Sequence, residues 1–237
     1  TLVGTLTLEG IPPEEWVEKV REREPDLDDR RVRYVALVEH LDDGIGRVLE
    51  ALDETGLADN TIVVYTSDNG GFLDAGACND PFRGSKPDVY EGGIRVPCFV
   101  RWPGHTDPGT ETDEAAMLMD FFPTFCEIAD VPVAHTIEGR SIRPLLEGGT
   151  VDFSDRVYYW VRREGTSGKG ACAGNSHHAV RKGGLKLLHN DAFSPLELFD
   201  VDKDERETTD LAKTDHPETE ALCRLMQHHI RLAGAVP

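Results

Sequence analysis

The sequence predicts an α/β protein, in which a layered sheet with helices is followed by a small antiparallel subdomain and a terminal helix. Over residues 1–150, segments with helical periodicity alternate with short runs rich in β-branched and aromatic residues. Over residues 151–237, short strand-like runs separated by turns lead into an amphipathic segment. We therefore expect a main α/β part over 1–150 and a C-terminal subdomain over 151–237.

Two helices are expected near the start of the chain. Residues 11–24 open with prolines and carry acidic residues in the first turn, as helix N-termini do. Residues 28–56 form the clearest helix, because apolar residues recur every three or four positions from Tyr34 to Leu52. Gly56 is a suitable C-cap for this helix.

Strands and a third helix are expected next. "TIVVYT" (61–66) is typical of a buried strand, and "IRVPCFVRW" (94–102) of a second one. Residues 67–93 between them predict a long loop, and loops of this length in compact domains are often functional. Residues 120–130 predict a helix with Asp120 as its N-cap.

The C-terminal part predicts short strands and a closing helix. The helix spans residues 215–234, with Asp215 and Glu218 as a capping box. The strand-like segments are 156–163, 177–183, 185–190 and 196–201.

Composition excludes some classes of function. The net charge is −19, from 44 acidic and 25 basic residues, which argues against a nucleic-acid partner because phosphate binding needs a basic face. No apolar run approaches the roughly 18 residues of a membrane span. The five cysteines form no C-x-x-C pair and no evident disulfide framework.

Asp68 and Asn69 are candidate metal ligands. They follow the first predicted strand directly, in "SDNGG", and ligands in α/β sheets bind beyond the carboxyl ends of strands. A carboxylate and an amide carbonyl supply two oxygen ligands of the kind that Ca²⁺ or Mg²⁺ prefers. The alternative is a plain Asx-Gly turn without a ligand.

Positively charged and imidazole side chains near these residues are further candidates. Lys86 lies in a loop rich in Gly and Pro and is suited to contact an anion as a compact charge. Arg83 is a second candidate in the same loop, and His177 or His178 could line a pocket after another Gly-rich stretch. The alternative for each is an ordinary surface or structural role.

Five segments, taken in order, closely resemble the sulfatase family of the alkaline-phosphatase-like superfamily. They are "YVALVEHLDDGIGRVLEALDETGLADNTIVVYTSDNGG", "RGSKPDVYEGGIRVPCFVRWPG", "DFFPTFCEIADV", "IEGRSIRPLLEG" and the pair "AVRKGGLKLL" with "LELFDVDKDERETTDLA". The resemblance covers roughly residues 12–213 and corresponds to the C-terminal half of an arylsulfatase-like protein.

The resemblance implies a sulfuric ester hydrolase that acts on a sulfated small molecule or a sulfated carbohydrate. Asp68 and Asn69 match the family's "DNG" metal ligands for Ca²⁺ or Mg²⁺, and Lys86 matches its sulfate-contacting lysine. In the family, a C/S-x-P-x-R motif carries the formylglycine nucleophile, whose hydrate attacks sulfur. The family often works outside the cytoplasm, so a periplasmic or secreted location is compatible with the resemblance, although no signal peptide is visible.

The chain also departs from the family. It contains no C/S-x-P-x-R motif and therefore no nucleophile, and "TLVGTLTLEG" (1–10) does not match the family there. We therefore expect an N-terminal part to be missing, with the nucleophile and further metal ligands in it, and expect this chain alone to be inactive. The alternatives are a non-catalytic sulfatase-like remnant or binding module, and a phosphoesterase of the same superfamily.

Overall fold

The structure is a computed structural model that describes residues 11–163, 176–190 and 194–234. The N-terminal stretch 1–10, which departs from the family pattern, lies outside these residues. In chain order the helices and strands are α1 (Glu14–Arg23), α2 (Asp29–Glu54), β1 (Val63–Thr66), α3 (Glu91–Ile94), β2 (Cys98–Arg101), α4 (Phe121–Ile128), α5 (Arg143–Leu146), β3 (Val157–Arg163), β4 (Ser176–Lys182), β5 (Leu185–His189), β6 (Glu197–Asp200) and α6 (Glu218–Gly234). The expected α/β class is confirmed.

The chain divides into two compact units. Unit 1 comprises residues 1–43, 67–96 and 154–237, and unit 2 comprises residues 44–66 and 97–153. Each unit is described by itself below. The domain boundary near residue 150 stays a prediction.

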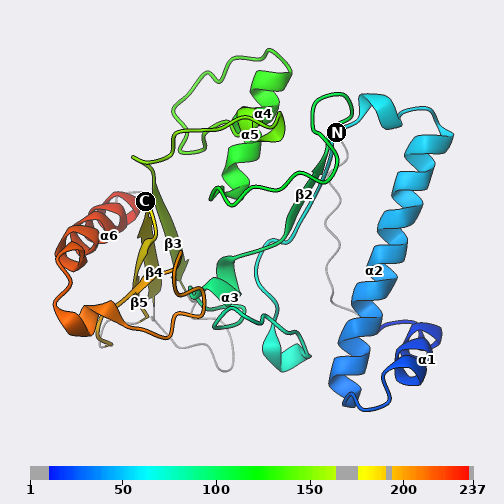
Figure 1. The fold of residues 1–237 in the computed structure, drawn as a ribbon, viewed down its shortest axis with the longest axis horizontal. Coiled ribbons are helices and arrows are strands. Elements are labelled where there is room, and N and C mark those ends of the chain that lie inside the picture. The colour runs from blue at the N-terminus through cyan, green and yellow to red at the C-terminus, as the bar shows by residue number, and fades with distance from the viewer. Residues whose placement is uncertain (1–10, 164–175, 191–193, 235–237) are drawn as a thin grey trace. The chain divides into compact units, whose positions relative to one another are not determined.

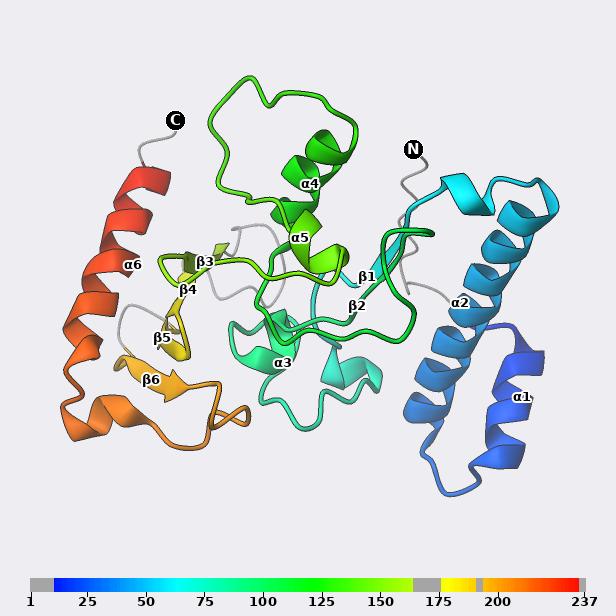
Figure 2. The same ribbon diagram turned by 45° about the horizontal axis from the view of Figure 1, so that its top comes forward.

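Unit 1 contains a four-stranded antiparallel sheet with the strands in the order β3–β4–β5–β6 (β3 to β5 in Figure 1, β6 in Figure 2). The four strands predicted for this region are confirmed to within a few residues. Helix α6 lies along one face of this sheet (Figure 2). Its Leu222 and Met226 pack with Val180, Leu187 and Leu198 of the strands. Period-2 alternation along the strands thus gives α6 a continuous apolar surface.

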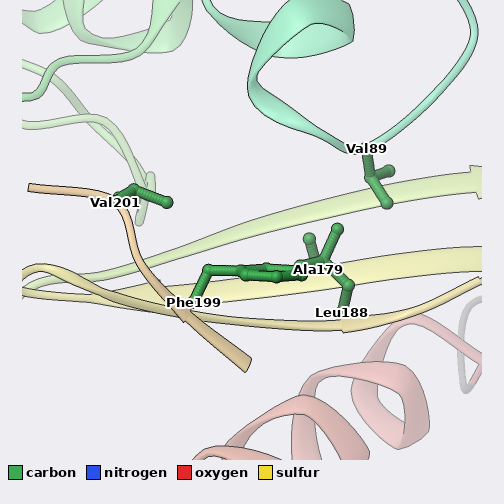
Figure 3. Packing of buried hydrophobic residues seen from close by; sticks show 5 residues of the cluster. All are labelled: Val89, Ala179, Leu188, Phe199 and Val201. Atoms are coloured by element: carbon green, nitrogen blue, oxygen red, sulfur yellow. The ribbon is translucent and has the colours of Figure 1, made fainter. Parts of the chain in front are cut away.

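The opposite face of this sheet is covered by the loop that carries Val89 (Figure 3). Val89 packs with Ala179, Leu188, Phe199 and Val201. Phe199 is 1% exposed, and burying a side chain of this size contributes about 2–3 kcal/mol. The segment between Lys86 and α3 is therefore part of the core of unit 1.

Helices α1 and α2 form a second cluster in unit 1 through Val17, Val20, Val32 and Ala36. Asp28, immediately before α2, accepts hydrogen bonds at Oδ1 from the N–H groups of the next turn, with N–O distances of 2.9 and 3.0 Å. This side chain caps the helix at its N-terminus. Both predicted helices are confirmed, and Gly56 after α2 adopts the expected positive φ of 67°.

Unit 2 contains the antiparallel pair β1–β2, in which Val64 lies opposite Val100. The predicted start of the second strand at Ile94 is wrong, because Glu91–Ile94 form the short helix α3 and the strand begins at Cys98. Pro97, directly before Cys98, has no N–H to donate to a ladder.

One predicted helix cap is confirmed in position only, and another is wrong. Asp120 is the N-cap residue of α4, but its carboxylate makes no capping bond and accepts instead from the backbone N–H groups of Met117 (2.7 Å) and Arg140 (2.9 Å). Asp215 adopts a left-handed conformation three residues before α6, and the Glu218 N–H bonds to His216 Nδ1 instead. Short polar side chains bind whichever backbone donor the turn presents, so sequence spacing alone misplaces them.

No helix among the described residues has the length and apolar character needed to cross a membrane.

Candidate active site

Asp68 and Asn69 lie in unit 1, two and three residues after the last residue of β1. The Asp68 side chain is exposed, and its Oδ1 accepts a hydrogen bond of 2.6 Å from Asn69 Nδ2. Within the described residues, Asn69 Oδ1 accepts no hydrogen bond. Both side chains therefore offer hard oxygen atoms of the kind that divalent cations bind.

Gly70 and Gly71 attach this turn to the loop that carries Lys86. The Gly70 N–H donates to Gly93 O at 2.9 Å, and a Cβ on Gly70 would overlap the carbonyl oxygen of Gly92. The Lys86 N–H donates to Gly71 O at 3.1 Å. Gly70 is thus needed for close backbone approach, whereas a Cβ on Gly71 would meet the side chains of Ala77 and Asn79.

Asn79 ties the same two segments together with its side chain. Its Nδ2 donates to Gly71 O at 2.8 Å and to Gly84 O at 3.0 Å, and its Oδ1 accepts from the Gly71 N–H at 2.9 Å. Sequence reasoning missed this residue, because an Asn in a polar loop follows no period that would single it out.

The Lys86 side chain is exposed, and its ammonium makes no hydrogen bond or ion pair with the described residues. Its neighbour Ser85 is held by a hydrogen bond from the Ser85 N–H to Asp88 Oδ2 at 2.9 Å. The backbone around Lys86 is thus fixed, whereas the charged end remains available to an anion.

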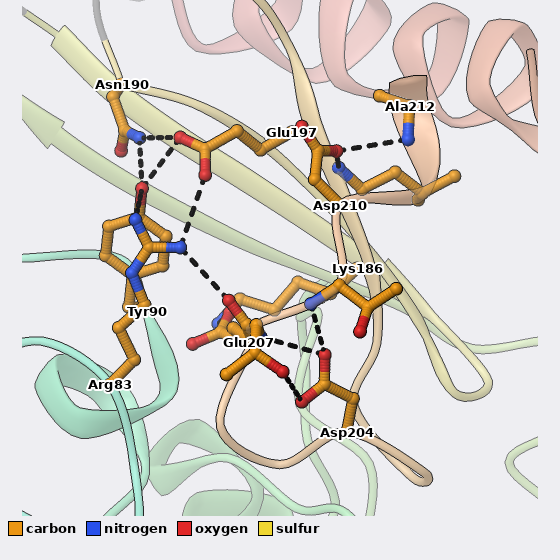
Figure 4. A network of polar contacts seen from close by, with 12 residues as sticks. Arg83, Tyr90, Lys186, Asn190, Glu197, Asp204, Glu207, Asp210 and Ala212 are labelled. Atoms are coloured by element: carbon orange, nitrogen blue, oxygen red, sulfur yellow. Dashed lines mark hydrogen bonds and ion pairs between the residues drawn. The ribbon is translucent and has the colours of Figure 1, made fainter. Parts of the chain in front are cut away.

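Arg83 is exposed, but its guanidinium contacts other protein groups (Figure 4). Its guanidinium stacks 3.9 Å from the centroid of the Tyr90 ring and donates to Glu207 O and Glu197 Oε2. The Tyr90 hydroxyl donates to Glu197 Oε1 at 2.7 Å, and burial followed by this hydrogen bond raises the pKa of Tyr90 to about 12. The role of Arg83 in a ligand pocket stays a prediction.

His177 and His178 are adjacent in β4, so their side chains point to opposite faces of the sheet. His178 shares its face with Val180, which packs on α6, and is buried. His177 is half-buried and lies opposite Arg162 of β3. Their proposed place in a pocket stays a prediction.

A buried cluster of three charges joins α3 to the sheet of unit 1. Lys186 of β5 is fully buried, and its Nζ lies 2.8 Å from Glu91 Oε1 and 3.0 Å from Glu207 Oε1. Glu207 Oε2 also accepts from the Glu91 N–H at 2.7 Å. Burial raises the pKa of Glu207, against the effect of Lys186. No pattern in the sequence singles out Lys186 as a member of such a cluster.

The donor set fits part of a divalent-cation site. Among the described residues there is no group of three or more His, Cys, Asp or Glu side chains able to hold a metal ion. Ca²⁺ takes six to eight oxygen ligands, so Asp68 and Asn69 alone would be too few, and their role as metal ligands stays a prediction.

Comparisons with known proteins define the family. Residues 11–131 match the model of the family described as Sulfatase, and residues 85–233 match that described as N-sulphoglucosamine sulphohydrolase, C-terminal. The chain belongs to the sulfatase family. The resemblance read from the five sequence segments is thereby confirmed, and the structural matches below confirm the alkaline-phosphatase-like fold.

Among curated relatives, the chain is 34% identical over 223 residues to the steryl-sulfatase of Rattus norvegicus, covering 79% of this chain and 37% of that protein. Among solved structures it is similar to Ps i-CgsB in complex with k-i-k-neocarrahexaose, with a TM-score of 0.77, 28% identity and coverage of 94% and 47% of the two chains. The chain therefore spans less than half the length of these proteins.

Two further structures are relevant to substrate class. BT4656 in complex with D-glucosamine-2-N,6-O-disulfate matches with a TM-score of 0.69 and 28% identity over 92% of this chain and 46% of that one. The phosphonate monoester hydrolase of Silicibacter pomeroyi matches with a TM-score of 0.66 and 26% identity, over 87% and 42% of the two chains.

Proposed function

We propose that this chain supplies part of the active site of a sulfuric ester hydrolase. Asp68 and Asn69 bind a divalent cation, Ca²⁺ or Mg²⁺, and Lys86 contacts the sulfate group of the substrate. The observation that carries the proposal is the double backbone linkage between the two segments, from Gly70 to Gly93 and from Lys86 to Gly71. These bonds keep the predicted metal ligands and the predicted anion ligand in one small, fixed region.

The chemistry of these residues suits a sulfate ester. A dication bound by Asp68 and Asn69 would withdraw charge from an ester oxygen as a Lewis acid. The Lys86 ammonium, on a backbone fixed beforehand, stabilises negative charge on sulfate oxygens without reorganising at the moment of reaction. The substrate class that we propose is a sulfated carbohydrate or a sulfated small molecule, supported by the ligands named for two of the related structures.

We further propose that catalysis needs groups beyond those of this chain. The sequence holds no formylglycine motif, and the described residues hold too few ligands for Ca²⁺. We expect the purified chain to hydrolyse an aryl sulfate no faster than its Lys86→Ala variant. Sustained turnover clearly above that variant would contradict this expectation.

Cation binding can be tested on the chain itself by titrating ¹⁵N-labelled protein with Ca²⁺ and following amide shifts. We expect shifts at Asp68 to Gly71 that are lost in the double variant Asp68→Asn, Asn69→Ala. Asp59→Asn is the matched control, since Asp59 is also an exposed aspartate in a short turn. Shifts scattered over the acidic surface, unaffected by the double variant, would remove the metal assignment.

Reading the source gene upstream of the Thr1 codon decides between the catalytic proposal and its first alternative. An in-frame C/S-x-P-x-R motif would support a sulfatase. A stop codon and a native start close to Thr1 would favour a non-catalytic binding module.

The second alternative, a phosphoesterase, is favoured by the similarity to a phosphonate monoester hydrolase. Inorganic sulfate and inorganic phosphate can be titrated separately against the labelled chain. We expect sulfate to shift the Lys86 region more than phosphate does, and expect Lys86→Ala to abolish the response. The reverse order of the two anions would favour the phosphoesterase.

A further inference from the structure

The Glu91–Lys186–Glu207 cluster draws its members from three separate parts of unit 1. Glu91 begins α3. Lys186 belongs to the middle of β5, and Glu207 lies in the connection after β6 (Figure 4). Glu91 is 3% exposed and Glu207 1%, while Lys186 is completely buried. Removing three charges from water is costly, and the Lys186 ammonium offsets part of this cost because it lies within 3.0 Å of both carboxylates.

The cluster is connected through the backbone next to Glu91 to the segments that carry the proposed site. Glu91 precedes Gly92 and Gly93, whose backbone groups bond to Arg83 O and to the Gly70 N–H at 2.7 and 2.9 Å. Gly71, next to Gly70, accepts from the Lys86 N–H. A continuous set of contacts therefore runs from the sheet through Glu91 to both halves of the site.

Neighbouring contacts provide a second attachment of the same loop to the same sheet. Val89 inserts into the apolar face formed by Ala179, Leu188 and Phe199. Arg83 donates to the backbone oxygen of Glu207 at 3.1 Å. Val89 and Arg83 fix the loop at the sheet surface, and Glu91 adds a carboxylate that reaches the buried Lys186 ammonium among the strands.

We propose that Glu91, Lys186 and Glu207 are positioning residues, through which the C-terminal sheet holds Lys86 and the Asp68–Asn69 turn in their binding geometry. The inference deepens the proposed function, since what Lys86 binds depends on that function. The mechanical link itself does not depend on it. In this proposal the C-terminal sheet stabilises the geometry of the site and is not structurally independent of it.

Hydrogen exchange of individual amides, measured by NMR at neutral pH, tests the link without substrate or metal. Glu91→Ala removes the side-chain contact with Lys186 and keeps only the bond from the residue 91 N–H to Glu207, and it leaves Lys186 and Glu207 as a neutral pair, so the sheet is expected to stay folded. We expect exchange at Gly70, Lys86 and Gly92 to accelerate by about tenfold or more, while Val180 and Leu187 keep their protection. Glu91→Gln is the matched control, because its Oε1 can still accept from Lys186 Nζ, and it should exchange as the unmodified chain does.

A second variant distinguishes loss of the Glu91–Lys186 contact from a general loss of stability. Glu91→Asp keeps the charge but shortens its reach to Lys186, and it should accelerate the same loop amides. Wild-type protection of the loop in both Glu91→Ala and Glu91→Asp would overturn the proposal. Acceleration in equal measure at the loop and at Val180 and Leu187 would also overturn it. Accelerated exchange confined to the loop in these variants, together with no anion binding at Lys86 in the unmodified chain, would instead count against the proposed function alone.

Discussion

The two units of the chain differ in how far their apolar side chains are buried. In unit 1, Leu187, Leu198 and Phe199 are almost completely buried between α6 and the Val89 loop. In unit 2, all of whose residues are described, Trp102 and Ile142 are the only buried apolar side chains, and Phe99 is 65% exposed. Hydrophobic burial has to offset the conformational entropy of each ordered residue.

This difference indicates where the stability of the chain resides. Unit 1 has apolar clusters on both faces of its sheet, whereas unit 2 has short strands and helices with little buried apolar surface. Large groups of exposed apolar side chains are typical of surfaces that contact another polypeptide segment or another protein. Substitutions should therefore have large effects in unit 1 and small effects at comparable positions in unit 2.

The largest effect is expected for Lys186→Met in unit 1. The substitution leaves the buried carboxylates of Glu91 and Glu207 without a compensating charge, and we expect the free energy of unfolding to fall by about 3–5 kcal/mol at pH 7. Urea denaturation followed by circular dichroism measures it. Lys203→Met, which alters an exposed lysine, is the control and should leave the midpoint unchanged.

The loss of stability in Lys186→Met is expected to depend on pH in a defined direction. The pKa of Glu207 is raised by burial and lowered by Lys186, so removing Lys186 raises it further above its unfolded value near 4.5. A raised carboxyl pKa contributes stability that is present below the unfolded pKa and lost as pH rises through the folded pKa. Lys186→Met should thus recover stability towards acid pH, and equal destabilisation at pH 5 and pH 7 would contradict the charge argument.

The next largest effect compares one residue type in the two units. Phe199→Ala empties a position that is 1% exposed in unit 1, and should cost about 3–4 kcal/mol. Phe99→Ala alters a largely exposed ring in unit 2 and should change stability by no more than about 0.5 kcal/mol. Denaturation of both variants under identical conditions gives the contrast. A similar cost for the two would show that Phe99 is buried in solution by a second copy of the chain.

A smaller and opposite pair of effects is expected for two glycines. Gly70→Ala in unit 1 places a Cβ against the Gly92 carbonyl and should destabilise the loop by about 1–3 kcal/mol. Gly46→Ala, in α2 within unit 2, meets no atom within 4 Å and should stabilise the helix by up to about 1 kcal/mol. The thermal unfolding midpoints of the two variants should therefore shift in opposite directions.

Much of the fold could be predicted from the sequence, because helical and strand periodicities report directly on which face is apolar. The helix around Tyr34 and the strands around Val180 and Leu187 are examples. The candidate site was reached from Asp68, Asn69 and Lys86, through residue chemistry and family resemblance. Lys186 could not be found in this way. Alternation puts it on the strand face of Leu188, and nothing local shows that the distant Val89 loop covers that face.

The smallest expected effect concerns the Tyr90 hydroxyl in unit 1. Burial and the hydrogen bond to Glu197 raise its pKa from 10.0 to about 12, so the neutral phenol contributes stability below pH 10 that is lost as pH rises through about 12. The stability difference between the unmodified chain and Tyr90→Phe should be constant below pH 10 and shrink above it. An ultraviolet titration should show one phenol ionising near pH 12, absent in Tyr90→Phe and shifted to lower pH in Glu197→Gln. An unchanged titration in Tyr90→Phe would mean that Tyr90 does not contact Glu197 of the sheet in solution. The difference in burial between unit 1 and unit 2 would then be smaller than the structure indicates.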